Sequence, residues 1–196
     1  KKNNNSKMAI NFNGRDKDIE IAVELIKKSS KPIMLYNNPA TANVDLTPDL
    51  VAELSHFQHI DFIKESTMDV TRVRDILDLS EGRINVFGGI MGYESFLSGA
   101  CGWVAVGSNI MPKEFSLLFS FAYKDKNLQE ARKIYKQVLP IIRLVGGHRY
   151  VSATKAALRE IGQSVGQPRP PRLPLPDSEM SNLKEVLEMS GVRRRP

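Results

Sequence analysis

Two side chains at the ends of predicted strands have the chemistry to capture a carbonyl compound. Lys64 closes the run at residues 61–63, and Tyr36 closes the apolar run at residues 32–35. A lysine confined away from water loses its proton more readily, and the neutral amine can attack a carbonyl carbon to form an imine. A phenol beside it could move protons while the imine forms and a carbon bond breaks. This pair is the first candidate for a reactive site.

Each of the two residues also has an ordinary structural explanation. Lys64 could be a charge near solvent, paired with Glu65 or Asp69, and Tyr36 could pack its ring in a core with its hydroxyl at the rim. Taken singly, these explanations outweigh catalysis. The position of both residues at the ends of neighbouring predicted strands favours chemistry, because parallel β/α barrels carry their active sites at the C-terminal ends of their strands.

Short apolar runs that alternate with amphipathic helices predict the elements that would position this pair. The alternation is typical of β/α units around a parallel sheet. The chain then turns helical, and a Pro-rich extended segment at residues 167–176 precedes a last helix. The predicted strands are 32–36, 61–64, 84–87 and 102–106, with a loop at 37–39; the predicted helices are 16–28, 48–55, 70–77, 92–98, 113–123, 128–145, 151–161 and 177–190.

The predicted organisation has four parts. Residues 1–15 are polar and Asn-rich and are expected to be irregular, residues 16–112 to form a parallel β/α barrel portion, residues 113–192 a helical portion, and residues 193–196 a basic tail.

Composition limits the kinds of partner. The 28 basic and 22 acidic residues give a formal charge of +6, but much of the excess lies at the two ends, and no nucleic-acid motif accompanies it. No apolar run is long enough to cross a membrane, and the N-terminal residues do not resemble a signal peptide. The single cysteine, Cys101, is expected to be a core thiol in a reducing compartment. We therefore expect a cytoplasmic protein that binds neither nucleic acid nor membranes.

Several local motifs resemble the dihydrodipicolinate synthase and N-acetylneuraminate lyase family. The resemblance covers about residues 32–192, and the order and spacing of its motifs make a chance match improbable. Its segments are Tyr36-Asn37-Asn38-Pro39, Ile63-Lys64-Glu65-Ser66, Gly88-Gly89, residues 99–109 with Pro112, Lys155-Ala156-Ala157-Leu158 with Gly162, and residues 170–175.

The resemblance implies a class I, Schiff-base-forming lyase or aldolase of the TIM-barrel type, which either cleaves or forms a carbon–carbon bond or dehydrates a keto sugar acid. Lys64 would form a Schiff base with pyruvate or another 2-keto acid, and Tyr36 would be the proton relay. Gly89 and the backbone at Val104 would help to shape the keto-acid pocket, although both residues have an equally good packing explanation. The covalent imine on Lys64 requires no metal or organic cofactor, and the family implies a homo-oligomer, either a dimer or a tetramer.

Two departures from the family pattern qualify this expectation. Thr41 stands five positions after Tyr36, where synthases of the lysine pathway have an arginine for the aldehyde's carboxylate, so a relative acting on another keto acid is favoured. Thr41 and Asn38 lie where specificity would be set. The second departure is that the family's N-terminal half has no counterpart before Lys31, so the chain is expected to hold about strands five to eight, with an exposed apolar inner face.

Alternative functions follow from that second departure. The chain could be a truncated, non-catalytic barrel remnant, or a half-barrel that functions only through oligomerisation. A third reading is a scaffold that binds acidic partners through Arg193, Arg194 and Arg195. The three histidines, His56, His59 and His148, show no metal-ligand spacing and are expected at the surface.

Overall fold

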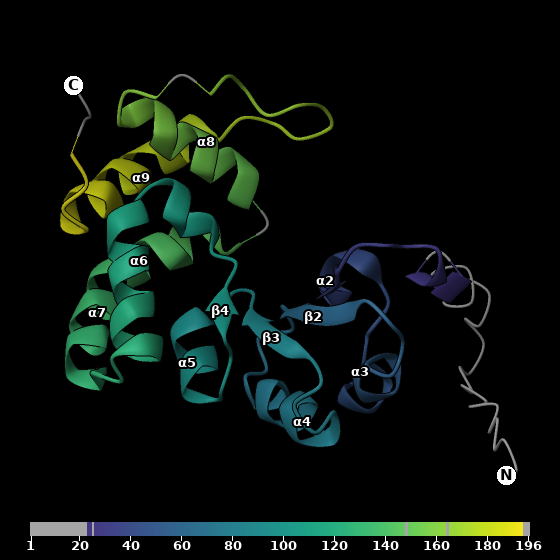
Figure 1. The fold of residues 1–196 in the computed structure, drawn as a ribbon. Helices are drawn as coiled ribbons and strands as arrows, with labels where there is room; N and C mark the ends of the chain where they lie inside the picture. The colour runs from purple at the N-terminus through teal and green to yellow at the C-terminus, as the bar shows by residue number, and fades with distance from the viewer. Residues whose placement is uncertain (1–22, 25, 148, 164, 194–196) are drawn as a thin grey trace, which may run out of the picture.

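A four-stranded parallel sheet forms the centre of the computed structural model, which describes residues 23–24, 26–147, 149–163 and 165–193. The strands are β1 (Ile33–Asn37), β2 (Ile60–Glu65), β3 (Asn85–Gly88) and β4 (Gly102–Trp103), and they lie side by side in chain order (Figure 1). The predicted alternation of strands and helices is therefore confirmed. The predicted irregular segment 1–15 and most of the helix expected over 16–28 lie outside the described residues, while Val23, Glu24, Ile26 and Lys27 are helical.

Three helices cover one face of the sheet. They are α3 (Pro48–Leu54), α4 (Thr71–Leu79) and α5 (Gly92–Leu97), each joining one strand to the next. The Thr47 side chain caps α3 by accepting a hydrogen bond from the backbone N–H of Leu50, and Pro48 takes the first helical position. The apolar side chains of these helices and of the strands form one core, which includes Val51, Leu54, Ile63, Val73, Ile76 and Val86.

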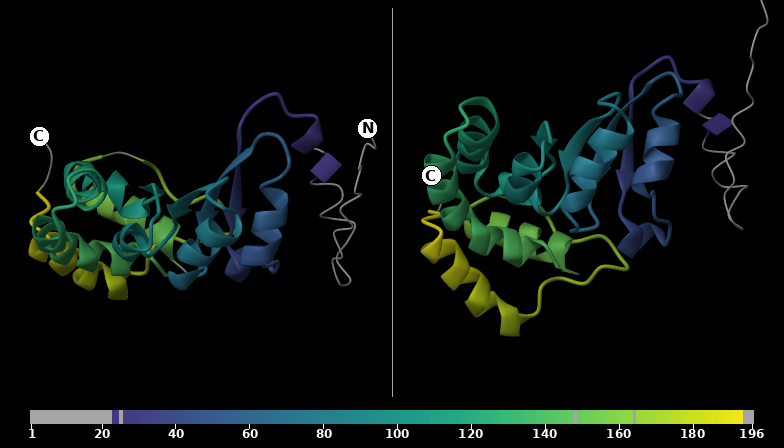
Figure 2. Two further views of the ribbon diagram at one scale, coloured as in Figure 1. Left: turned by 60° about the horizontal axis from the view of Figure 1, so that its bottom comes forward. Right: turned by 90° about the horizontal axis from the view of Figure 1, so that it is seen from below.

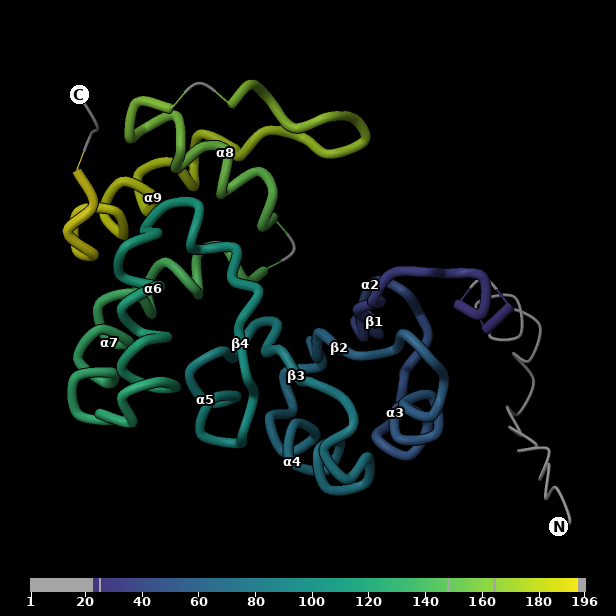
Figure 3. Tube along the Cα trace, viewed as in Figure 1, coloured from purple at the N-terminus to yellow at the C-terminus, as the bar shows by residue number. Residues whose placement is uncertain are grey.

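The other face of the sheet is much more open. Along β1, Met34 and Tyr36 are 41% and 54% exposed, while Asn37 is buried on the opposite face. Successive side chains of a strand point to opposite faces, so this pattern places Tyr36 on the face away from the helices. Within the described residues, β1 pairs only with β2 and β4 only with β3 (Figure 3). An exposed apolar surface was expected on this face, and Met34 and Tyr36 supply it.

The C-terminal helices gather at the β4 end of the sheet (Figure 2). They are α6 (Pro112–Phe119), α7 (Leu128–Val145), α8 (Tyr150–Glu160) and α9 (Asp177–Met189), and α7, α8 and α9 pack on one another. Helix α7 continues through Pro140, as predicted, and residues 167–176 form neither helix nor strand and turn at residues 170–172. The helix predicted over 113–123 changes at Ser120 into a π-helical turn (Ser120–Lys124).

Two predicted boundaries were wrong. The strand predicted over 102–106 ends at Trp103, and a 3₁₀ helix (Val106–Asn109) begins three residues later. The neighbouring strand β3 ends at Gly88, whose carbonyl accepts a hydrogen bond from the N–H of Val104, so β3 has no further backbone groups with which residues 105–106 could pair. The loop predicted at 37–39 is instead the last residue of β1, one linking residue and the start of α2 (Pro39–Ala42), because proline suits the first turn of a helix.

Cys101 is half-buried and not the core thiol that was expected. It precedes β4, where its backbone N–H bonds to the carbonyl of Val86. Partial burial raises the pKa of the thiol, so Cys101 is a weak nucleophile at neutral pH. None of the helices in the described part of the chain is long and apolar enough to cross a membrane.

Candidate functional site

Tyr36 and Lys64 are cross-strand neighbours at the C-terminal ends of β1 and β2. The strand register pairs the two residues directly, and Lys64 Nζ lies 4.0 Å from the centroid of the Tyr36 ring. A lysine ammonium at this distance over a phenol is attracted by the negative face of the ring. The predicted adjacency of the two residues is confirmed. Both side chains lie on the open face of the sheet, where a small molecule could reach them.

Lys64 makes neither of the ion pairs considered for it. Among the described residues, neither Glu65 nor Asp69 forms an ion pair with Lys64: Glu65 bonds to Asn37 and to the backbone of Thr67, and Asp69 caps the start of α4 through Thr71. Lys64 is half-buried. The two carboxylates considered as partners are thus engaged elsewhere, and the Lys64 amine lies beside the Tyr36 side chain.

The environment of the Tyr36 phenol favours its ionised form. Asn38 Nδ2 donates a hydrogen bond to the phenol oxygen at 2.9 Å. Partial burial acts to raise the pKa of Tyr36, but the Asn38 amide, the Lys64 ammonium and the Ser66 hydroxyl together hold this pKa below its ordinary value. A phenol with a lowered pKa exchanges protons more readily near neutral pH, as a proton relay requires.

Spectrophotometric titration can check the Tyr36 pKa. We expect the titration curve of the parent protein to contain a phase from a phenol that ionises below pH 10. This low-pH phase should be lost in Tyr36→Phe. In Lys64→Met the phase should move to higher pH, because the neighbouring positive charge that stabilises the phenolate is gone.

Tyr135 provides the control for this titration. Burial and a hydrogen bond to Glu94 raise the pKa of Tyr135 well above its ordinary value, so Tyr135→Phe should leave the low-pH phase intact. A low-pH phase that persists in Tyr36→Phe would contradict the assignment.

The remaining predicted site residues differ in whether they contact Tyr36 and Lys64. Asn38 contacts Tyr36 directly, whereas Thr41 is exposed on α2 and its hydroxyl donates to the carbonyl of Asn38 at 3.2 Å. Gly89 follows β3 and donates its N–H to the carbonyl of Glu65 at 2.7 Å. Val104 is exposed just after β4 and bonds to Gly88. The structure thus brings Asn38 and Lys64 into contact with Tyr36 and places Gly89 and Val104 just beyond the ends of the next two strands.

Gly89 is packed so closely that no side chain fits. A Cβ atom at this position would lie 1.8 Å from Ser66 Oγ and 2.7 Å from the carbonyl oxygen of Glu65. The Ser66 side chain could rotate, but the Glu65 carbonyl belongs to the sheet and cannot move without disturbing β2. Gly89 therefore sets how closely β3 approaches the residues that follow Lys64.

Replacing Gly89 with alanine should destabilise the protein strongly. We expect the free energy of unfolding, measured by urea denaturation, to fall by about 3 kcal/mol, the upper end of the usual cost of overpacking. Gly147→Ala is the matched control, because nothing lies within 4 Å of a Cβ atom there. A Gly89→Ala protein as stable as Gly147→Ala would show that β3 and β2 do not pack as described.

Sequence reasoning missed a set of buried polar residues behind the pair. Asn37 and Glu65 are 1% and 5% exposed and are hydrogen-bonded to each other, and Arg72 of α4 reaches the same place through Asp45. One feature of the sequence could have predicted these residues. Side chains two apart in a strand share a face, so Glu65 must lie on the same face as the core residue Ile63 and needs buried hydrogen-bond partners there.

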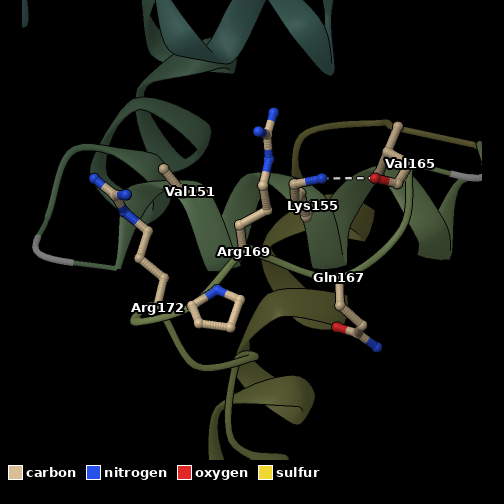
Figure 4. A pocket seen from close by; sticks show the side chains of 7 residues that line it. Val151, Lys155, Val165, Gln167, Arg169 and Arg172 are labelled. Atoms are coloured by element: carbon tan, nitrogen blue, oxygen red, sulfur yellow. Dashed lines mark hydrogen bonds between the residues drawn. The ribbon is translucent and has the colours of Figure 1, made fainter.

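A separate pocket of about 700 Å³ lies between α8 and the Pro-rich segment (Figure 4). Lys155 projects from α8 there and donates a hydrogen bond to the carbonyl of Val165 at 2.6 Å. Neither Tyr36 nor Lys64 belongs to this pocket, whose lining residues are Val151, Lys155, Val165, Gln167, Arg169, Pro170 and Arg172.

The histidines were expected at the surface, without a metal site. His56 is exposed and His59 half-buried in the connection between α3 and β2, whereas His148 lies outside the described residues. Within the described part of the chain, no three side chains of His, Cys, Asp or Glu are grouped so that they could hold a metal ion.

Curated relatives of this chain are named 4-hydroxy-tetrahydrodipicolinate synthase. The protein of that name from Geobacter sp. (strain M21) is 32% identical over 159 residues, which cover 80% of this chain and 54% of the relative. A second, from Methanothrix thermoacetophila, is 30% identical over 169 residues, covering 84% of this chain and 56% of the relative. The chain thus spans little more than half the length of these relatives.

Solved structures of similar proteins show the same fold over most of this chain. The chloride-inhibited dihydrodipicolinate synthase from Acinetobacter baumannii, complexed with pyruvate, has a TM-score of 0.83 at 27% identity, covering 88% of this chain and 60% of that one. A prophage protein of the dihydrodipicolinic acid synthase family from Escherichia coli K12, also with pyruvate, has a TM-score of 0.81 at 25% identity, covering 89% and 61%.

The fold agrees with what these comparisons indicate. The parallel sheet with its helices has the α/β architecture of the TIM-barrel enzymes to which it is similar. A model of the Dihydrodipicolinate synthetase family matches residues 19–190, which is most of the chain. The chain belongs to the dihydrodipicolinate synthetase family.

Proposed function

We propose that this chain carries the reactive centre of a Schiff-base-forming lyase or aldolase that acts on pyruvate or another 2-keto acid. The observation that supports this most strongly is the contact between Lys64 Nζ and the Tyr36 ring at the ends of two neighbouring parallel strands. Two structural relatives hold pyruvate, which is the simplest 2-keto acid.

The chemistry begins at Lys64. Its amine, once neutral, attacks the C2 carbonyl carbon of the keto acid to give a carbinolamine, and loss of one water molecule leaves an imine. Removal of a proton from C3 then gives an enamine, whose C3 attacks a second carbonyl; the reverse sequence cleaves a carbon–carbon bond. Tyr36 carries protons to the leaving hydroxyl and to or from the oxygen of the second carbonyl. The imine is the electron sink, so the scheme requires no metal or organic cofactor.

The neighbouring residues would shape substrate binding. Asn38 orients the phenol of Tyr36 through the hydrogen bond to its oxygen. Gly89 and Val104 would border the keto-acid pocket on the next two strands. Thr41 offers a neutral hydroxyl where lysine-pathway synthases have an arginine, so we propose a second substrate other than the aldehyde of that pathway, such as a sugar-acid derivative.

Deuterium exchange tests the proposed function without knowledge of the second substrate. In D₂O, reversible formation of the enamine replaces the C3 hydrogens of pyruvate with deuterium, which proton NMR records as loss of the methyl signal. The proposal predicts exchange at a rate proportional to protein concentration. Exchange at the rate of pyruvate alone, with 2-oxobutanoate also inactive, would overturn it.

A second candidate is a non-catalytic or incomplete barrel portion that functions only through association. The exposure of Met34 and Tyr36 and the unpaired outer edge of β1 in the described structure support it. In this proposal, residues 16–112 are about strands five to eight of a barrel, and residues 113–192 pack beside them. Light scattering distinguishes the candidates: a dimer or tetramer that exchanges deuterium supports an assembled enzyme, whereas association without exchange supports a purely structural role.

A further inference from the structure

A hydrogen-bonded polar cluster, buried at its centre and open to solvent at one end, lies on the far side of the sheet from Tyr36 and Lys64. Asn37 and Glu65 directly follow these two residues and are paired in the next step of the same register. Strand alternation turns their side chains to the helix-covered face, where they are 1% and 5% exposed. We call the set Asn37, Asp45, Glu65 and Arg72 the Asn37 cluster; Arg72 is half-buried in it and Asp45 is exposed.

Hydrogen bonds fix both oxygens of the Glu65 carboxyl group. Asn37 Nδ2 donates to Glu65 Oε2 at 2.9 Å, and the backbone N–H of Thr67 donates to Glu65 Oε1 at 2.7 Å. The backbone repeats the connection, since the N–H of Ser66 bonds to the carbonyl of Asn37 at 3.0 Å. The ends of β1 and β2 are therefore joined by side chains as well as by the strand ladder.

Arg72 closes the cluster from α4 through two shared acceptors. Asp45 Oδ1 accepts from Arg72 at 2.9 Å and from Asn37 Nδ2 at 3.2 Å. The carbonyl of Leu46 accepts from the same two side chains, at 2.9 Å and 3.2 Å. The Asn37 amide is held on its other side as well, because its Oδ1 accepts from the N–H of Leu46 at 3.0 Å. Arg72 therefore braces the segment that holds the Asn37 side chain.

Such a cluster fixes the relative position of the ends of β1 and β2 more than it stabilises the fold. Buried polar groups lose their water, so a satisfied network adds little net stability compared with apolar side chains of the same volume. Apolar contacts, however, have no direction, whereas these hydrogen bonds define the relative position of two strand ends. The network occurs where that definition matters, immediately after Tyr36 and Lys64.

We infer that Arg72, acting through Asn37 and Glu65, is a positioning residue that holds Tyr36 and Lys64 at the separation required for proton transfer at the imine. This inference rests on the proposed function and extends it to residues that do not touch the substrate. Rates of reactions between held groups are sensitive to misplacement, and a shift of about 1 Å can cost about a hundredfold.

The test compares three variants on the same helix. Arg72→Met removes all three hydrogen bonds to Asp45 and Leu46, while Arg72→Lys keeps the charge but cannot present the two donors of a planar fork. Arg74→Met is the matched control, because Arg74 is exposed and pairs only with its neighbour Asp75 among the described residues. Each variant is checked for folding by circular dichroism and urea denaturation before measurement.

Arg72→Met should slow the deuterium exchange of pyruvate about tenfold at saturation, with the apparent KM changed less than about twofold. Arg72→Lys should restore part of the rate, and Arg74→Met should match the parent. Titration of Tyr36 gives a second readout that needs no keto acid: its pKa should move up toward its ordinary value in Arg72→Met, because Lys64 is no longer held beside the phenol.

The outcomes separate the two proposals. A parent protein that exchanges no deuterium overturns the proposed function, and the Tyr36 titration then decides the positioning claim alone. An active parent whose rate and Tyr36 titration are the same in Arg72→Met and Arg74→Met overturns the positioning claim. If Arg72→Met does not fold, Arg72→Lys decides by the same two readouts.

Discussion

Replacing Lys64 with methionine is expected to reduce deuterium exchange at C3 of pyruvate to the rate measured without protein. Methionine keeps most of the length and apolar surface of the side chain but has no amine, so no imine and hence no enamine can form. Lys64 makes no ion pair among the described residues, so the loss of its charge should change the free energy of unfolding by less than about 1 kcal/mol.

The control for this variant is a second lysine that lies over a tyrosine ring. Lys126 Nζ lies 4.8 Å from the centroid of the Tyr123 ring, after the π-helical turn and away from the strand ends. Lys126→Met removes the same kind of cation–π contact and should leave exchange unchanged. Residual exchange in Lys64→Met that still depends on protein concentration would show that another group forms the imine.

Replacing Tyr36 with phenylalanine is expected to slow exchange by about 10²–10⁴-fold, the usual contribution of a positioned acid or base. The ring, and with it the contact to Lys64, is retained, whereas the phenol oxygen that accepts from Asn38 is lost. Imine formation should continue slowly, because water can reach the open face of the sheet and replace the relay.

Tyr123→Phe is the matched control for Tyr36→Phe, since Tyr123 also lies under a lysine. NMR measures the exchange rates, and the amount of imine at equilibrium is measured in parallel. If Tyr36→Phe exchanged as fast as Tyr123→Phe, the phenol would have no part in proton transfer, and the relay would have to be assigned to another group.

The sequence predicted the central pair because its signals are local. The first two predicted strands each end at a reactive residue, and parallel strands bring such ends to one edge of the sheet, so the adjacency of Tyr36 and Lys64 could be predicted from the strands. The first turn of α3 was predictable for the same reason, since Thr47 and Pro48 act within a few residues of each other.

The Asn37 cluster could not be predicted in this way. Asn37 and Glu65 are 28 positions apart, and Arg72 is 27 positions from Asp45, so their contacts depend on the exact register of β1 against β2 and on the docking of α4. The short β4 was missed for a related reason: strand propensity continues to Val106, but β3 has no further backbone groups to pair with it.

Borohydride trapping with pyruvate tests the central claim most directly. Borohydride reduces an imine to a stable secondary amine, so intact mass counts the adducts, and peptide mapping locates them. The proposed function predicts one pyruvate-dependent adduct on Lys64 that is absent in Lys64→Met. No adduct on folded protein with any 2-keto acid tested, or an adduct that maps elsewhere and persists in Lys64→Met, would contradict it.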